Sequence, residues 1–316
     1  MSMPNKISPL QNWLPIKFSN RDHLLVEWMN AGNKQFTEPF FDDSISAIKR
    51  IDRKHFRSVS SLEMVNEWSS LLTSLQPSAI IFHVSRCGST LLSQLLANDE
   101  RNIVLSEVPF LDEILRLPYK NENYSPGECL NYVQSAIKFY GQQRLASQEQ
   151  LFIKTDSWHL HFYETLRKAY PNIPFILLYR NPAEVFQSQQ KQRGLHAIPG
   201  MVEEKIFGIS AVNTTDFDRH LAEVLSSYFR KMIAIKTSGD PLVISYNYRH
   251  GITGLVNKSY ELIRMDMSQE LQKKIAARTS YHAKNPQQIF AADYDGKNTP
   301  PYLQEAIELY KQLDRL

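Results

Sequence analysis

Residues 79–97 read AIIFHVSRCGSTLLSQLLA, and this stretch decides the fold. The mostly apolar run at residues 79–84 is typical of a buried strand, and leucines recur at helical spacing over residues 89–97. The turn Ser85-Arg86-Cys87-Gly88 lies between them. Because the free N–H groups and the dipole of a helix N-terminus both favour negative charge, this arrangement predicts an anion-binding loop.

The alternation of strand and helix continues along the chain. Short apolar runs recur at residues 103–105, 151–153, 174–179 and 242–246, with helical patterns between them. Nearly all-apolar strands that alternate with helices predict a central parallel sheet flanked by helices on both faces. We therefore expect an α/β fold of three layers.

The N-terminal part lacks this regularity. Aromatic residues are scattered over residues 1–57 without a sustained period, so we expect an irregular N-terminal arm that packs on the body. Ser60-Ser61-Leu62-Glu63 has the form of a capping box and predicts a helix that reaches about residue 75. We divide the chain into residues 1–78, the arm with its helix, and residues 79–316, the main domain.

Composition excludes several classes of protein. The 316 residues are 42% hydrophobic, which is enough for a large core, and the net charge of +3 is too small to indicate nucleic acid as the main partner. Two cysteines, Cys87 and Cys129, cannot form a disulfide framework, which favours a reducing compartment. No signal peptide or transmembrane stretch is apparent, so we expect a cytoplasmic protein.

Ligands of such sheets bind beyond the carboxyl ends of the strands. The residues that follow the predicted strands are rich in cations and hydroxyl groups, and therefore predict an anion site. They are Ser85, Arg86, Cys87, Gly88, Ser89, Thr90, Glu107, Lys154, Thr155, Asp156, Arg180 and residues 246–249.

The loop differs from that of nucleotide kinases. Their loop reads G-x-x-x-x-G-K-[ST], whereas here Ser89 follows Gly88 and His83 occupies the position of the first glycine. The cation, Arg86, instead precedes the glycine by two residues. This pattern argues against ATP with magnesium, and a strand–helix turn capped by its own hydroxyl groups would also fit this segment alone.

Residues 83–92, HVSRCGSTLL, resemble the 5′-phosphosulfate loop of sulfotransferases that use 3′-phosphoadenosine 5′-phosphosulfate (PAPS). The family form is P-K-S-G-T-T-W. Arg86 falls on the family lysine, Gly88 on the glycine, and Ser89 and Thr90 on the two hydroxyl residues.

Two positions depart from that form. Cys87 replaces a serine, and Leu91 replaces a tryptophan that often stacks on the adenine. The resemblance therefore leaves the adenine to another residue, for which Tyr246 and Tyr248 are the candidates.

A second motif strengthens the resemblance. The family's 3′-phosphate motif is a strand followed by R-[ND]-P-x-[DE]-V-x-x-S, and residues 180–188, RNPAEVFQS, fill every fixed position. Ser188 lies roughly 10 Å along the helix from its start, so Arg180 and Ser188 can hold one phosphate between them. The resemblance covers about residues 79–297 and implies a P-loop-type sulfotransferase domain with PAPS as co-substrate, adenosine 3′,5′-bisphosphate as product, and no metal.

The resemblance also implies catalytic roles. Arg86 would stabilise charge on the bridging oxygen, and Lys154 would add positive charge near the sulfuryl group. Glu107 is the first candidate for the base, because members that act on heparan chains and protein tyrosines have a glutamate after this strand. Asp156 is the second, since it stands where many cytosolic members have the histidine of K-T-H.

Other positions remain open. His159 or His161 is the third candidate for the base. In the tail, Lys284 is a candidate ligand of the 3′-phosphate, although the family's K-G-x-x-G form is absent.

The predicted function is therefore transfer of a sulfuryl group from PAPS to a hydroxyl or amine acceptor by in-line displacement. A P-loop nucleotide kinase and a non-catalytic adenosine bisphosphate-binding protein are the alternatives. The acceptor can be a small molecule, a lipid, a sugar or a peptide. We expect residues 1–57, 108–127 and 193–215 to frame its pocket, since long aperiodic connections in compact domains are usually functional.

Overall fold

A computed structural model describes residues 8–51, 56–210, 215–278 and 299–316. Its main sheet has five parallel strands in the order β5-β6-β4-β7-β8. The strands are β4 (Ala79–His83), β5 (Asn102–Ser106), β6 (Gln150–Lys154), β7 (Phe175–Tyr179) and β8 (Val243–Asn247). The predicted α/β fold with a central parallel sheet is confirmed.

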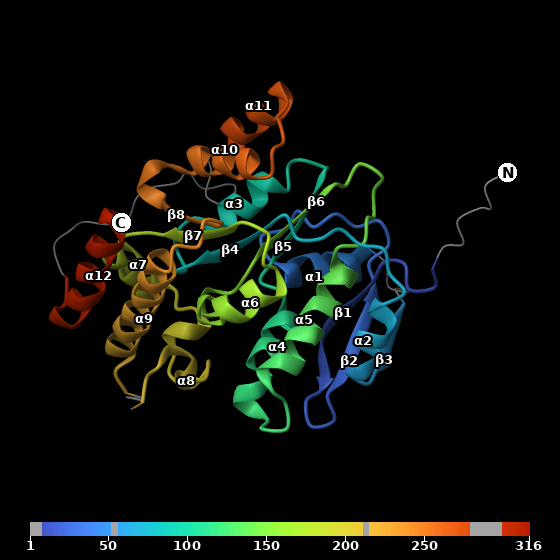
Figure 1. Ribbon diagram of the computed structural model, residues 1–316, viewed down its shortest axis with the longest axis horizontal. Helices are drawn as coiled ribbons and strands as arrows, with labels where there is room; N and C mark the ends of the chain where they lie inside the picture. The colour runs from blue at the N-terminus through green and yellow to red at the C-terminus, as the bar shows by residue number, and fades with distance from the viewer. Residues whose placement is uncertain (1–7, 52–55, 211–214, 279–298) are drawn as a thin grey trace.

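Helices cover both faces of this sheet. Figure 1 shows α3 and α10 on one side and α5 and α6 on the other. The helices of the main domain are α3 (Ser89–Leu96), α4 (Pro109–Lys120), α5 (Pro126–Tyr140), α6 (Tyr163–Ala169), α7 (Pro182–Lys191), α8 (Glu204–Phe207), α9 (Phe217–Thr237), α10 (Ile252–Leu262), α11 (Gln269–Arg278) and α12 (Gln304–Arg315). Short 3-10 helices are η1 (Ser157–Phe162), η2 (Leu195–Ala197), η3 (Tyr248–His250) and η4 (Pro301–Leu303).

The central strand β4 is buried along its whole length. Ile80, Ile81 and Phe82 are at most 1% exposed, because β6 and β7 pair with the strand on either side and helices cover its faces. Burial on both faces explains why the strand lacks the alternation of a half-exposed strand. Within the described residues, no helix has the length and apolar character that crossing a bilayer requires.

The expectation of an irregular N-terminal arm is wrong for the part that the structure describes. β1 (Trp13–Asn20), β2 (Leu25–Asn30) and β3 (Arg57–Ser60) form an antiparallel sheet, and α1 (Phe41–Ile51) lies between β2 and β3 in the chain. Local periodicity could not reveal it, because β1 contains register shifts and β2 pairs with a strand far along the chain. The sheet packs on the main domain, where Tyr140 donates a hydrogen bond of 2.5 Å to the Pro15 carbonyl.

The capping-box prediction is also corrected. α2 spans only Glu63–Ser69, and its N-cap is Leu62, which makes no side-chain cap. Ser60 instead ends β3, and its hydroxyl accepts a hydrogen bond of 2.8 Å from the Trp28 indole. The Ser60 hydroxyl thus binds Trp28 and does not cap the helix, contrary to the prediction from the local pattern.

Candidate active site

The loop between β4 and α3 has an unusual backbone. Ser85, Arg86 and Gly88 adopt φ angles of 65°, 48° and 85°, so two non-glycine residues lie in the left-handed region. Such conformations persist where the surroundings enforce them and are common at ligand sites. The loop leads directly into the N-terminus of α3, as the predicted anion cradle requires.

Gly88 cannot carry a side chain without a collision. A Cβ atom at this position would overlap ring carbons of Tyr248, which lies against the turn. The structure therefore places Tyr248 over the phosphate loop. Tyr246 instead donates a hydrogen bond of 2.8 Å to the Gly251 carbonyl and lies against Gly254, which leaves Tyr248 as the residue nearer to the loop.

Gly88→Ala is expected to lower the free energy of unfolding by at least the roughly 1–2 kcal/mol of a left-handed alanine, and to weaken anion binding by displacing Tyr248. Gly239→Ala is the matched control, because Gly239 has a φ of 74° and a Cβ added there would meet no atom within 4 Å. Chemical denaturation and calorimetric titration measure the two effects. Equal affinity in the two variants would contradict a role for the Gly88–Tyr248 contact in binding.

The two sequence motifs meet in space. Arg180 follows β7, and its Nη1 donates to the Arg86 carbonyl at 3.2 Å. In return, Arg86 Nη2 donates to the Ser188 carbonyl at 3.2 Å. Arg180 also pairs with Glu184 and lies 5.3 Å from the centroid of the Tyr248 ring. Two hydrogen bonds from arginine side chains thus join the phosphate loop to the segment of Arg180 and α7.

Local capping sets the start of α7. The Asn181 side chain accepts a hydrogen bond of 3.0 Å from the Ala183 amide, and Pro182 occupies the first helical turn. This cap explains why the chain turns directly after Arg180.

Arg86 has a donor available for a ligand. Its Nε is buried and has no hydrogen-bond partner among the described residues. Burial lowers the pKa of Arg86, but an arginine remains a cation in proteins. Buried N–H groups in native proteins nearly always have acceptors, so this atom is a candidate donor to an anionic oxygen.

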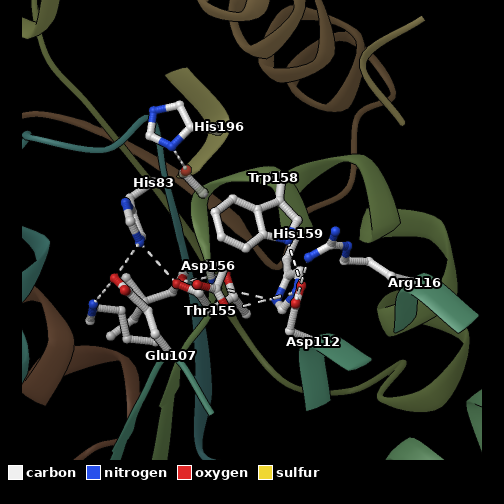
Figure 2. A network of polar contacts seen from close by, with 12 residues as sticks. His83, Glu107, Asp112, Arg116, Thr155, Asp156, Trp158, His159 and His196 are labelled. Carbon is white, nitrogen blue, oxygen red and sulfur yellow. Dashed lines mark hydrogen bonds and ion pairs between the residues drawn. The ribbon is translucent and has the colours of Figure 1, made fainter. Parts of the chain in front are cut away.

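Beside the loop, Glu107 and Lys154 form an ion pair at the ends of β5 and β6 (Figure 2). The Lys154 side chain is fully buried, whereas the Glu107 side chain is 24% exposed. The Lys154 ammonium also lies 5.2 Å from the centroid of the Phe40 ring, which comes from the N-terminal part. Lys154 is therefore shielded from solvent, and the exposed part of the pair belongs to Glu107.

His83, which sequence reasoning did not assign to the site, connects the loop to this pair. Its Nδ1 accepts a hydrogen bond of 3.0 Å from the Ser85 amide, which places the ring proton on Nε2. Nε2 donates to the Thr155 carbonyl at 2.9 Å and lies 3.5 Å from Glu107 Oε1. Burial lowers the pKa of His83 and keeps it neutral. Its place directly before the predicted turn was the one available sequence signal.

Electrostatics keep Glu107 ionised. Burial acts to raise its pKa, but the charge of Lys154 and the hydrogen bond from His83 outweigh burial and hold the pKa well below its ordinary value. Both partners contact Oε1. Within the described parts of the chain, no donor binds Oε2, so this oxygen can accept a proton from a ligand.

Asp156, the second candidate for the base, has a different environment. It caps η1, and its amide donates to His159 Nδ1 at 3.3 Å. Burial, followed by the charges of Glu107 and Asp112, raises its pKa well above the ordinary value. Figure 2 shows Asp156 between the Glu107 group and the Asp112 group.

Asp112, Asp156 and His159 place ligand atoms within 4.8 Å of one another, which is a geometry that could hold a cation. Asp112, however, already accepts hydrogen bonds from Trp158 (2.6 Å), Arg116 (2.9 Å) and His159 (3.0 Å). A fixed guanidinium at that distance opposes a metal ion. We interpret the group as an ion-pair network that orients His159.

The remaining predicted residues lie as follows. Cys87 is fully buried and its thiol contacts the Leu178 carbonyl, with burial raising its pKa to about 12, so only its backbone can face a ligand. Ser89 is buried at the start of α3 and Thr90 is half-buried. His161 contacts Ser227, with its pKa lowered by burial to about 4, which indicates a packing role. Lys284 lies outside the described residues.

Comparison with known families adds to this geometry. Residues 77–197, which include both motifs and the Glu107–Lys154 pair, match the sequence model of the sulfotransferase family. Over these residues the chain is similar to the sulfotransferase family. The expected resemblance to sulfotransferases is thereby confirmed, and it supports sulfotransfer activity in general. No curated protein sequence matches the chain.

Several solved structures resemble this chain. The sulfotransferase domain of the Synechococcus PCC 7002 olefin synthase has a TM-score of 0.50 and 17% identity, and covers 77% of this chain and 96% of that one. A sulfotransferase domain from the curacin biosynthetic pathway has a TM-score of 0.49 and 13% identity, with coverages of 77% and 99%. A sulfotransferase from Mycobacterium avium has a TM-score of 0.48 and 14% identity, with coverages of 86% and 84%. The first of these supports the shared fold.

Proposed function

We propose that this protein is a sulfotransferase that moves a sulfuryl group from PAPS to a hydroxyl or amine acceptor. The observation that supports the proposal best is the reciprocal contact between the two motifs, in which Arg180 binds the Arg86 carbonyl and Arg86 binds the Ser188 carbonyl. One nucleotide that carries a phosphosulfate and a separate phosphate can span these two segments. The phosphate loop of a nucleotide kinase would not need the segment of Arg180 and Ser188, because ATP has no 3′-phosphate.

The donor would be held by both segments. The loop N–H groups, with Ser85, Ser89, Thr90 and Arg86, would bind the 5′-phosphosulfate. Arg180 and Ser188 would bind the 3′-phosphate, with Lys284 as a further candidate, and Tyr248 would contact the adenine. Adenosine 3′,5′-bisphosphate would be the product.

The chemistry is an in-line displacement at sulfur. The acceptor oxygen or nitrogen forms a bond to sulfur, the bond from sulfur to the bridging phosphate oxygen breaks, and the negative charge moves onto that oxygen. Arg86 would stabilise this charge. Glu107 Oε2 would accept the acceptor's proton, and Asp156 is the second candidate for that role.

Lys154 would orient Glu107. Its ammonium is fully buried against the carboxylate and the Phe40 ring. It would keep Glu107 ionised before the acceptor binds. Its positive charge would also lie near the sulfuryl group, with the Glu107 carboxylate beside it.

The partners and the location are part of the same proposal. The acceptor would be a small molecule, a lipid, a sugar or a peptide, and nucleic acid would not be a partner. Both cysteines are free and buried, which fits a reducing, cytoplasmic environment.

Ligand-dependent unfolding tests the donor. Adenosine 3′,5′-bisphosphate at about 100 times its dissociation constant should stabilise the protein by about 2.7 kcal/mol, a shift that thermal unfolding detects. Stabilisation by ATP with magnesium alone would favour a kinase. Stabilisation by the bisphosphate without any PAPS turnover over a panel of acceptors would favour a non-catalytic binding protein.

Turnover is expected to be independent of magnesium. The loop supplies its cation from Arg86 and lacks the Lys-Ser/Thr pair that accompanies the metal in kinases. PAPS turnover measured with and without a chelator should be equal. Loss of turnover in the chelator, with recovery on adding magnesium, would contradict this expectation.

A further inference from the structure

Gln189 is the residue after Ser188 in α7, and its side chain contacts Ser85 of the phosphate loop. It is 1% exposed. Its Nε2 donates to Ser85 Oγ at 3.0 Å and to His196 Nε2 at 3.2 Å, and its Oε1 accepts from the Gly194 amide at 2.7 Å. Both amide protons are used, so the orientation of this side chain is determined.

The contact with Ser85 prepares that residue for an anion. Because Ser85 Oγ accepts a hydrogen bond from Gln189, its own O–H remains a donor. The Ser85 amide is held by His83 Nδ1 at 3.0 Å. Ser85 is therefore fixed on two sides while its backbone has a φ of 65°.

The contact with His196 is equally defined. Burial lowers the pKa of His196 to about 3, so the ring is neutral and Nε2 remains an acceptor. Its Nδ1 lies 3.4 Å from Ser157 Oγ, which also accepts from the Tyr228 hydroxyl at 3.1 Å. Figure 2 shows His196 in the same network as His83 and Trp158.

His196 lies near the start of a segment that we call the strap, residues 194–208, which contains η2 and α8. The other part of the strap is held by Arg116, which binds Glu203 at 2.7 and 3.1 Å and the Met201 carbonyl at 3.0 Å. Arg116 also binds Asp112, at 2.9 Å. The strap thus extends from the phosphate loop to the carboxylates beside Asp156.

We propose that Gln189 is a positioning residue that couples the phosphate loop to the strap, so that binding of the sulfuryl donor orders the acceptor side of the site. The inference rests on the proposed function for the identity of the anion in the loop. An anion that accepts the Ser85 O–H proton strengthens the hydrogen bond that Ser85 accepts from Gln189, because chained hydrogen bonds polarise one another. The strengthened contact favours the strap conformation in which Gln189 binds His196 and Gly194. By linkage, that conformation of the strap increases the affinity for the anion.

Hydrogen exchange of the strap amides tests this coupling, with Gln189→Met as the test variant. Methionine keeps the length of the side chain and removes all three hydrogen bonds. Gln190→Met is the matched control, since Gln190 is exposed and bonds Asp218 instead. In the unaltered protein and the control, adenosine 3′,5′-bisphosphate should slow exchange in the strap on the order of tenfold, and Gln189→Met should abolish this dependence and weaken bisphosphate affinity by a similar factor.

A purely structural role gives a different result. Gln189→Met would then speed exchange in the absence of ligand yet keep the same ratio between ligand-bound and ligand-free exchange, and this outcome overturns the inference. If Gln189→Met does not fold, Ser85→Ala replaces it, because this change cuts only the loop side of the connection. Strap protection that still responds to the bisphosphate in Ser85→Ala also overturns the inference.

Failure of the proposed function is recognised separately. If the unaltered protein does not bind adenosine 3′,5′-bisphosphate, the proposed sulfotransferase function is wrong. Hydrogen exchange of the strap amides in the absence of ligand then tests the coupling. Ser85→Ala should then speed strap exchange when Gln189 is present and leave it unchanged in a Gln189→Met background. An equal effect in both backgrounds overturns the coupling.

Discussion

Glu107→Gln is expected to lower turnover by roughly 100-fold or more while leaving affinity for adenosine 3′,5′-bisphosphate unchanged. Glutamine keeps the shape of the side chain but cannot take up the acceptor's proton at neutral pH. Single-turnover measurement of PAPS consumption gives the rate, and calorimetry gives the affinity.

The same change should destabilise the fold. Lys154 is fully buried, so removal of its partner leaves an uncompensated charge that costs roughly 3–5 kcal/mol. The double variant Glu107→Gln with Lys154→Met removes both charges and should regain stability without regaining turnover. Recovery of turnover in the double variant would show that Glu107 acts only as the partner of Lys154.

The pH dependence distinguishes the two carboxylates. The pKa of Glu107 is held well below its ordinary value, so a reaction that uses it as base should show no acid limb from pH 5 to 8. The pKa of Asp156 is raised well above its ordinary value, so a reaction that uses Asp156 should accelerate as pH rises through that raised value. Asp156→Asn is the paired variant. If it abolishes turnover while Glu107→Gln leaves turnover intact, the base is Asp156.

The ion pair also sets the direction of the pH effect on stability. Because the pKa of Glu107 is lower in the folded than in the unfolded protein, its contribution is complete above the unfolded value of about 4.3 and is lost as pH falls toward the folded value. The double variant should therefore lose less stability than the unaltered protein between about pH 5 and pH 3.

Arg180→Ala is expected to weaken adenosine 3′,5′-bisphosphate binding by about 10- to 100-fold, the scale of 1.5–3 kcal/mol for a charge-assisted hydrogen bond. The hydrogen bond to the Arg86 carbonyl holds the charged Arg180 side chain beside the loop. Calorimetric titration measures the loss. Arg180→Lys should recover only part of it, because an ammonium lacks the planar fork of arginine.

Two controls separate charge from structure in that experiment. Glu184→Gln removes the partner of Arg180 in the ligand-free protein and should leave binding equal or tighter. Arg230→Ala removes an exposed arginine paired with Glu305 on α12 and should leave affinity unchanged. Unchanged affinity in Arg180→Ala would remove Arg180 from the binding site.

Sequence alone determined the features that depend on neighbours in the chain. The order of strands and helices in the main domain follows from apolar runs and helical spacing, and the N-cap at Asn181 follows from local chemistry. The loop at residues 85–90 and the motif at residues 180–188 were also readable, because both lie directly after strands of one parallel sheet. That placement brings both segments to the same edge of the sheet, and the pairing of β4 with β7 makes them neighbours there.

Only the tertiary structure decided the features that depend on residues far apart in the chain. The N-terminal sheet joins β2 to β3 across α1, and no local period encodes that pairing. The ionisation of Glu107, the raised pKa of Asp156 and the neutral state of His83 depend on burial and on charges brought from other strands. Gln189 likewise has no motif of its own, since its importance arises from the three partners that its buried amide meets. Electrostatic free energies depend on distance and on desolvation, and the folded chain alone sets both.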